Sequence, residues 1–390
     1  MIATILAWGI ALPPLLAFAI YAIEVLAGLK PLARAQAAST PPSIAVLIPA
    51  HQEAAGIGIT VCRLRGELGE GGRILVVADN CSDATAACAR EAGADVIERN
   101  DPVRRGKGFA LSFGREHLAL DPPRVVVVLD ADCFFLSGSL ACLAAAAADG
   151  RPAQAVNLLL PDRAASPLVQ ISNFAFLVKN LIRARGTSRL GGATLLTGTG
   201  MAFDWKTFAA APLASGDIVE DLGLGLALLR AGIRPRLVEQ AQVRSAPAGI
   251  AESRGQRQRW EHGFLATALR QSPRLLLRGL LAPSRSLFAL GLHLLVPPLA
   301  LLFLLSGMAL LATCALVLAG ASWAAALALG TAMAAAGSAT LLAWFREGRA
   351  WLAPAALLRA PLYILWKAPL YARFLIAPET RWVRTRRRDD

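Results

Sequence analysis

Short apolar runs alternate with helix-like segments along the middle of the chain. Strands are expected at Ile44–Pro49, Ile74–Ala78, Asp95–Glu98 and Val125–Leu129, and a helix at Ala84–Ala92. Apolar runs of this length, bounded by polar residues, are typical of buried parallel strands. Strand–helix–strand alternation implies right-handed crossovers within one sheet. The pattern therefore predicts an α/β domain with a Rossmann-like, mostly parallel sheet.

Much longer apolar stretches stand at both ends of the chain. Between Ile2 and Leu29 the one charged residue is Glu24, and Leu287–Phe345 contains no Asp, Glu, Lys or Arg. A membrane-crossing helix needs about 20 residues, so the first stretch predicts one crossing and the second predicts two. A cleaved signal peptide is the alternative for the first stretch, but no basic segment precedes it and no clear cleavage site follows.

A third apolar segment, Trp351–Leu375, carries Arg359, Lys367 and Arg373 with Trp and Tyr between them. This spacing is typical of a helix in the membrane interface, and a fourth crossing is the alternative. The expected organisation is an N-terminal anchor at 1–30, an α/β domain at 43–275, two membrane helices at 286–346, the interfacial helix or fourth crossing at 350–376, and a basic tail at 377–390.

Composition and charge agree with a membrane protein. The chain has 390 residues, 55% of them hydrophobic, a mean hydropathy of +0.50 and a formal net charge of +13, which is too apolar for an ordinary soluble protein. Positive residues flank the expected crossings: Lys30, Arg34, Arg270, Arg274, Arg278, Arg285, Arg346, Arg349 and the arginines of 381–388. The positive-inside rule makes their side cytoplasmic, and their charge favours anionic lipid headgroups as partners. Nucleic-acid binding is disfavoured, because these arginines cluster beside membrane segments.

Six cysteines show no Cys-x-x-Cys spacing and no paired histidines. A zinc site is therefore not expected, and a cytoplasmic domain would keep the thiols reduced.

Acidic residues stand where the expected strands end. Glu53, Asp79 and Asp130 all fall there, and ligands bind beyond the carboxyl ends of parallel strands. Asp130 and Asp132 at i and i+2 can face one divalent ion and leave positions for a substrate phosphate. Surface turns also produce such pairs, so this interpretation depends on the other motifs. Helix capping is the alternative for Asp79 and Asp83.

A basic turn, Arg104-Arg105-Gly106-Lys107-Gly108, precedes the Asp-Ala-Asp strand. It is not a P-loop, because Asp101 occupies the first glycine position and Gly108 replaces the Ser or Thr after lysine. Backbone N–H groups and Lys107 could still approach a phosphate. A solvated charged loop is the alternative.

Two further motifs follow. Glu220-Asp221 leads into an apolar helix at Leu222–Leu229, and two consecutive acids there suggest a general base. One acid at a helix N-terminus would need no function. Gln256, Arg259 and Trp260 share one face of a helix, where Arg can bind a diphosphate and Trp can pack against a sugar. Arg and Trp are also common near lipid headgroups, which is the alternative.

In this order, the strand-end acid, Asp-x-Asp, Glu-Asp and Gln-x-x-Arg-Trp resemble the membrane-embedded, cellulose-synthase-like glycosyltransferases of family 2. The resemblance covers Ser43 to about Phe264 and the flanking membrane layout. It implies a GT-A fold, a UDP-sugar donor, and Mg²⁺ or Mn²⁺ held by Asp130 and Asp132. Two departures are Ala78, where many members carry an acid, and Val219, where synthases often have Thr.

The resemblance also implies roles for single residues. Asp221 would be the catalytic base, with Glu220 beside it, and Asp79 would read the uracil. The other expected donor-binding residues are Pro49, Glu53, Lys107, Asp130, Gln256, Arg259 and Trp260. Gly198 and Thr199, in a Gly-rich segment, would lie near the acceptor together with Trp260.

A single base without a carboxylate nucleophile implies one displacement with inversion, so an α-linked UDP-sugar gives a β-linked product. The expected acceptor is a membrane lipid or lipid-linked glycan in cell-surface polysaccharide or glycolipid synthesis. A processive β-glycan synthase is the main alternative, and a nucleotidyltransferase is a remote one. We expect an integral protein of the bacterial inner membrane with a cytoplasmic catalytic domain. Neither the sugar nor the oligomeric state follows from the sequence.

Overall fold

A computed structural model describes residues 1–33, 42–69, 71–217, 219–246 and 250–377, without the side chains of 250–254, 256 and 257. The expected basic tail and the Gln256 side chain therefore lie outside the described residues. The chain forms two compact units, one of Pro31–Leu160 and Ala193–Gly263 and one of Met1–Lys30, Pro161–Gly192 and Phe264–Glu379.

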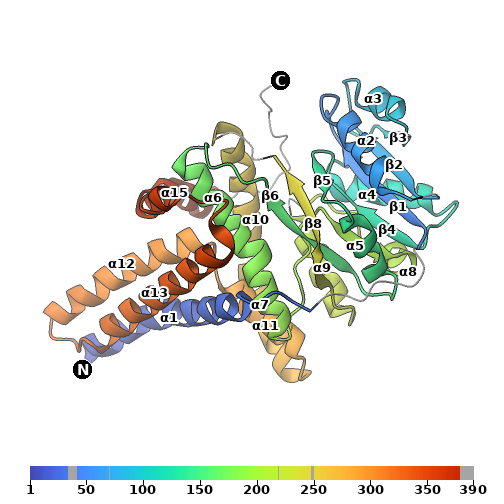
Figure 1. The fold of residues 1–390 in the computed structure, drawn as a ribbon. Coiled ribbons are helices and arrows are strands. Elements are labelled where there is room, and N and C mark those ends of the chain that lie inside the picture. The colour runs from blue at the N-terminus through green and yellow to red at the C-terminus, as the bar shows by residue number, and fades with distance from the viewer. Residues whose placement is uncertain (34–41, 70, 218, 247–249, 378–390) are drawn as a thin grey trace. The chain divides into compact units, whose positions relative to one another are not determined.

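The first unit, here the sheet unit, has alternating strands and helices (Figure 1). Its elements are β1 (Ile44–Ala50), α2 (Ile57–Glu67), β2 (Arg73–Asp79), α3 (Thr85–Glu91), β3 (Asp95–Arg99), α4 (Lys107–Leu118), β4 (Val125–Val128), β5 (Cys133–Phe135), α5 (Ser139–Ala147), β6 (Ala153–Leu159), β7 (Met201–Asp204), α8 (Trp205–Ala210), α9 (Glu220–Arg230), β8 (Arg236–Ser245) and the beginning of α10 (Ile250–Leu281). The four strands expected between Ile44 and Leu129 and the helix expected at Ala84–Ala92 are confirmed.

Among the described residues, eight strands form one mixed sheet in the order β3-β2-β1-β4-β7-β6-β8-β5. β1 pairs in parallel with β2 on one side and β4 on the other, while β7 runs antiparallel to β4. The chain thus proceeds in opposite directions from β1, which creates a topological switch point at the carboxyl ends of β1 and β4. Ligands bind at such points in open α/β sheets.

Both faces of this sheet are buried. Val46 and Ile48 of β1 belong to one core, which includes α2 and α5, whereas Ala45 and Leu47 belong to another, which includes α4 and α9. Side chains alternate along a strand, so a strand covered on both faces is apolar throughout. This burial explains the uninterrupted apolar runs in the sequence.

The second unit, here the helical unit, contains the apolar helices. Its elements are α1 (Ile2–Gly28), α6 (Pro167–Leu177), the π-helix η1 (Val178–Arg183), α7 (Ala184–Arg189), the end of α10, α11 (Arg285–Leu295), α12 (Leu299–Leu318), α13 (Ala324–Ala343), the π-helix η2 (Trp344–Gly348), α14 (Pro354–Leu357) and α15 (Ala360–Ile376). Within the described residues, three helices are long and apolar enough to cross a membrane, Ile2–Gly28, Leu299–Leu318 and Ala324–Gly348. α1 packs against both others (Figure 1).

α12 and α13 are joined by a turn in which Gly320 has φ +91°. α11 is a separate shorter helix that ends before Pro297-Pro298. α15 has 17 residues and carries Pro369 inside. The assignment of α15 to the interface or to a fourth crossing stays a prediction.

Candidate active site

The loops that follow β1 and β2 are joined by side-chain hydrogen bonds. His51 Nδ1 donates to the Asp79 carbonyl oxygen at 2.7 Å. Gln52 Oε1 accepts from the backbone N–H groups of Ser82 and Asp83, and Glu53 N–H donates to Thr85 Oγ1 at 2.7 Å. These bonds connect the carboxyl ends of β1 and β2, next to Pro49, and make this edge of the sheet polar.

The Asp79 carboxylate is buried in an ion pair. Arg99, at the end of β3, donates to Asp79 Oδ1 at 2.6 Å, and both side chains are at most 10% exposed. Arg99 also contacts Asp101 at 3.2 Å. Asp83 Oδ1 accepts from the Thr85 N–H at 3.1 Å in the turn before α3, but the N-cap of that helix is Ala84. Asp79 therefore has a structural partner, and its expected role at the uracil stays a proposal.

Lys107, the first residue of α4, points inward. Its Nζ donates to Asp130 Oδ1 and, at 2.7 Å, to the Gly198 carbonyl oxygen, and it lies 4.0 Å from Glu220 Oε1. Burial alone would lower the pKa of Lys107, but the charges of Asp130 and Glu220 raise that pKa above its ordinary value. Arg104, by contrast, is 70% exposed and pairs with Asp101. The basic turn thus combines a solvated arginine with a half-buried lysine.

Gln154 of β6 forms hydrogen bonds with the backbone of the Gly-rich segment that contains Gly198 and Thr199. The Gln154 side chain accepts from Thr197 N–H at 3.0 Å and donates to the Thr199 carbonyl oxygen at 2.9 Å. Thr199 Oγ1 in turn accepts from the Asp130 N–H at 3.1 Å. This network fixes Gly198 and Asp130 relative to each other.

Glu220 and Asp221 form the first turn of α9. Asp221 Oδ1 accepts from the Leu222 N–H at 2.7 Å. Gly198 has φ +80°, and a Cβ there would lie 3.1 Å from Lys107 Nζ and 3.3 Å from Asp221 Oδ2. Because Gly198 has no side chain, the Lys107 ammonium and the Asp221 carboxylate can both lie close to its backbone.

Glu220 titrates differently from an ordinary glutamate. Burial, followed by the negative charge of Asp221, raises the pKa of Glu220 to about 8, while Lys107 opposes the change. A carboxyl group whose pKa is raised toward neutral pH by its surroundings is typical of catalytic sites.

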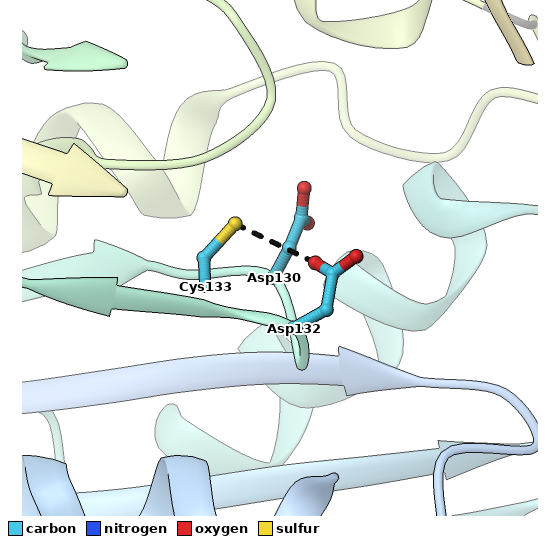
Figure 2. A group of neighbouring side chains, drawn as sticks. All are labelled: Asp130, Asp132 and Cys133. Atoms are coloured by element: carbon cyan, nitrogen blue, oxygen red, sulfur yellow. Dashed lines mark hydrogen bonds between the residues drawn. The ribbon is translucent and has the colours of Figure 1, made fainter. Parts of the chain in front are cut away.

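Asp130, Asp132 and Cys133 form a group that could hold a metal ion. Within the described residues searched, their ligand atoms lie within 4.8 Å of one another, with Asp132 exposed, Asp130 half-buried and Cys133 buried. Figure 2 shows all three side chains pointing to the same side of the turn between β4 and β5. The Cys133 thiol donates a hydrogen bond to Asp132 Oδ1 at 3.5 Å. Two carboxylates are suitable for a hard divalent cation.

α10 reaches the same region from a different part of the chain. A Cβ at Gly263 would lie 2.8 Å from Val219 Cγ1, so α10 passes close to the beginning of α9. Arg259 and Trp260 are four and three residues before Gly263 and share its face of the helix. Arg259 is half-buried and Trp260 is 40% exposed.

The site contains three residues that the sequence motifs did not reveal: Arg99, Gln154 and Cys133. The available signal was a polar residue inside an apolar strand for Gln154, and adjacency to the Asp-Ala-Asp motif for Cys133. Arg99 carried no signal, because an arginine at the end of a short strand is usually solvated.

Comparison with known proteins decides the family. The model of glycosyl transferase family group 2 matches residues 125–336, more than half of the chain, and the model of glycosyl transferase family 2 matches residues 45–162. The chain belongs to glycosyltransferase family group 2. The glycosyltransferase is thus an enzyme of the class that the motifs predicted, and the nucleotidyltransferase alternative is wrong. No curated protein matches this glycosyltransferase.

One solved structure confirms the GT-A fold class of the glycosyltransferase. A mannosyltransferase from Pyrobaculum calidifontis, in complex with GDP-Man and Mn²⁺, is 18% identical with a TM-score of 0.55, covering 91% of this chain and 99% of that one. A glucosyl-3-phosphoglycerate synthase from Mycobacterium tuberculosis, with Mn²⁺, UDP and glucosyl-3-phosphoglycerate, is 21% identical with a TM-score of 0.40, covering 58% and 79%. The first similarity extends over both units and establishes the fold alone.

Proposed function

We propose that this glycosyltransferase transfers a sugar from a UDP-sugar to a lipid or lipid-linked glycan in the membrane, with inversion at the anomeric carbon. One observation carries the proposal: Lys107 and Asp221 both lie close to Gly198, and Lys107 also binds Asp130. The Lys107 ammonium, which could bind a diphosphate, and the Asp221 carboxylate, which could accept a hydroxyl proton, are therefore near each other at the topological switch point.

Asp130 and Asp132 fit a divalent cation, because their oxygens converge beyond a strand end and Asp132 is exposed. They would hold Mg²⁺ or Mn²⁺. When bound, such an ion stabilises the negative charge that develops on a leaving diphosphate.

The remaining donor contacts come from the chain itself. The Lys107 ammonium, half-buried among acids, is suited to the diphosphate, and Arg259 adds a planar cation for the same group. Pro49, Glu53 and Asp79 surround the polar edge proposed for the nucleoside. Gln256 and Trp260 are proposed to contact the donor and acceptor sugars.

Asp221 is the proposed general base. The raised pKa of Glu220, about 8, keeps Glu220 mostly protonated at neutral pH, so Glu220 is a poor base there. Asp221 removes the proton from the acceptor hydroxyl, the hydroxyl oxygen bonds to the anomeric carbon, and the bond from that carbon to the diphosphate breaks. A single displacement turns an α-linked donor into a β-linked product.

The membrane part of the proposal is supported by the three helices that could cross a bilayer among the described residues. We propose an inner-membrane location with a cytoplasmic catalytic domain. α14 and α15 are proposed to lie at the interface, where Tyr363 stacks on Trp366 at 6.0 Å and Leu362 and Leu365 are exposed.

The test uses the full chain purified in lipid, with radiolabelled UDP-sugars and GDP-mannose supplied separately. We expect transfer from a UDP-sugar that EDTA abolishes and Mg²⁺ or Mn²⁺ restores. Asp132→Asn should eliminate transfer, whereas Asp121→Asn, on the exposed loop before β4, should not. Full activity without metal would refute the metal role, and transfer from GDP-mannose alone would refute the UDP assignment.

Product size separates limited transfer from the processive alternative. We expect labelled product in the lipid-soluble fraction with one or a few sugars. A ladder that extends to high polymer from the purified protein would favour a β-glycan synthase.

A further inference from the structure

Cys133 is placed against the metal-binding acids by the backbone. It follows Asp132 directly, and its N–H donates to the Asp130 carbonyl oxygen at 3.1 Å, which closes a tight turn. As the first residue of β5 it then pairs with Ser245 of β8. The turn and the strand pairing together fix the sulfur beside the carboxylates.

The Cys133 side chain is buried beside the Asp132 carboxylate. Cys133 is 4% exposed, and its Sγ lies 3.5 Å from Asp132 Oδ1. Figure 2 shows the sulfur directed toward the same space as the two carboxylates and not away from them. All three ligand atoms lie within 4.8 Å, close enough for one ion to reach them together.

We propose that Cys133 is a soft third ligand of this centre, so that Co²⁺, Zn²⁺ and Cd²⁺ bind through sulfur while Mg²⁺ and Mn²⁺ use the carboxylate oxygens. The proposal rests on the metal role of Asp130 and Asp132 given above. Thiolate selects softer ions, whereas carboxylates suit Mg²⁺ and Mn²⁺, so one centre with both ligand types discriminates by ion class.

The binding step balances simply. A soft ion displaces the thiol proton to buffer, the S–H bond breaks and a sulfur–metal bond forms. An ion held by three protein ligands leaves more slowly than one held by two. Zn²⁺ and Cd²⁺ therefore act as competitive inhibitors of the ion that supports transfer.

The direct test adds Co²⁺ to the purified chain and records the near-ultraviolet absorption of a thiolate–Co²⁺ bond. We expect this band in the wild type, its loss in Cys133→Ser, and its displacement by excess Mn²⁺. Cys142→Ser, a half-buried cysteine of α5, should keep the band. Absence of the band in the wild-type protein, or its persistence in Cys133→Ser, would overturn the proposal.

Binding affinities give a readout that does not depend on activity. Cys133→Ser should weaken Cd²⁺ binding by about tenfold or more and Mn²⁺ binding by less than about threefold. Equal loss for both ions would mean a structural role only and would contradict the proposal. Asp132→Asn serves as the separate arm: if Mn²⁺ binding survived it unchanged, the proposed metal site itself would fail, whatever Cys133 does.

Discussion

Two clusters of charged residues, one buried in the helical unit and one half-buried in the sheet unit, differ in how completely their members are paired. In the helical unit, Glu24 of α1 accepts from Arg183 Nε at 2.7 Å and contacts His293 Nδ1 at 2.8 Å, with all three residues no more than 7% exposed. In the sheet unit, Lys107 neutralises Asp130, while Glu220 lies 4.0 Å away beside a second acid. Similar side chains thus occur in two electrostatic situations.

The helical cluster is a closed network at a close helix crossing. A Cβ at Gly28 would lie 1.8 Å from the Ile182 carbonyl oxygen, and one at Gly186 would lie 1.9 Å from that of Glu24. The backbones of α1 and the α7 region therefore touch. Thr187 Oγ1 also contacts His293 Nδ1, at 3.1 Å. Each charge finds its partner inside the protein, which makes the cluster suitable for holding helices together.

The sheet cluster is imbalanced instead. Two acids follow one another at the N-terminus of α9, and one of them is forced toward its protonated form. Such an arrangement costs stability and is typical of sites that exchange protons or bind charged substrates. The comparison teaches that complete pairing, together with full burial, separates a structural charge cluster from a chemically reactive one.

The largest effect is expected for the reactive cluster. Asp221→Asn should reduce transfer by about 10²–10⁴-fold, because the acceptor hydroxyl would lose its base. The nucleotide affinity of the variant, measured by titration calorimetry, should stay near the wild-type value. An equal loss of nucleotide affinity would place Asp221 in the donor site.

The closed network should respond through stability. Arg183→Met leaves Glu24 buried without its main cation and should destabilise the protein by about 3–5 kcal/mol. Thermal unfolding in lipid measures this change. Adding Glu24→Gln should recover part of the loss, since the orphaned charge is removed. A cost no larger than that of a surface pair would contradict the closed-network interpretation.

Gly198→Ala tests the crowding at the reactive cluster. The methyl group would meet Lys107 Nζ and Asp221 Oδ2, and the positive φ adds about 1–2 kcal/mol of strain. Gly138→Ala is a matched control, because Gly138 has φ +74° with nothing within 4 Å. Both variants should lose similar stability, but only Gly198→Ala should lose transfer, by about tenfold or more. Equal activity of the two variants would exclude a role for the Gly198 approach.

Glu220→Gln should have the smallest effect at neutral pH. The amide resembles the protonated acid, so transfer at pH 7 should fall by less than about tenfold. Since folding raises the pKa of Glu220 from 4.5 to about 8, the folded state binds the proton more tightly. Its contribution to stability is present below pH 4.5 and is lost as the pH rises to about 8. Unfolding measured across this range should show a flatter pH dependence in the variant, and an identical slope would disprove the assigned shift.

Much of the sheet unit could be predicted from the sequence, because its signals are local. An apolar run with acids directly after it identifies a buried strand and a strand-end site, as at Val125–Asp132. Spacing within one helix likewise placed Arg259 and Trp260 on a common face. These inferences need no knowledge of distant contacts.

The tertiary structure decided what depends on contacts between remote segments. Pro161–Gly192 lies inside the span expected for the α/β domain, yet it packs with the apolar helices, since Gly186 and Arg183 meet α1. The support of Thr197 by Gln154 and the pairing of Asp79 with Arg99 also join distant parts of the chain.

The sequence by itself therefore determined the element types, the family motifs and the three helices able to cross a membrane. Only the fold decided which charges are paired, because a pKa or an ion pair depends on distances of a few ångströms across the whole chain. Glu24 and Glu220 are the same residue type in the sequence. Glu24 is paired with Arg183 and His293, whereas Asp221 places a second negative charge beside Glu220.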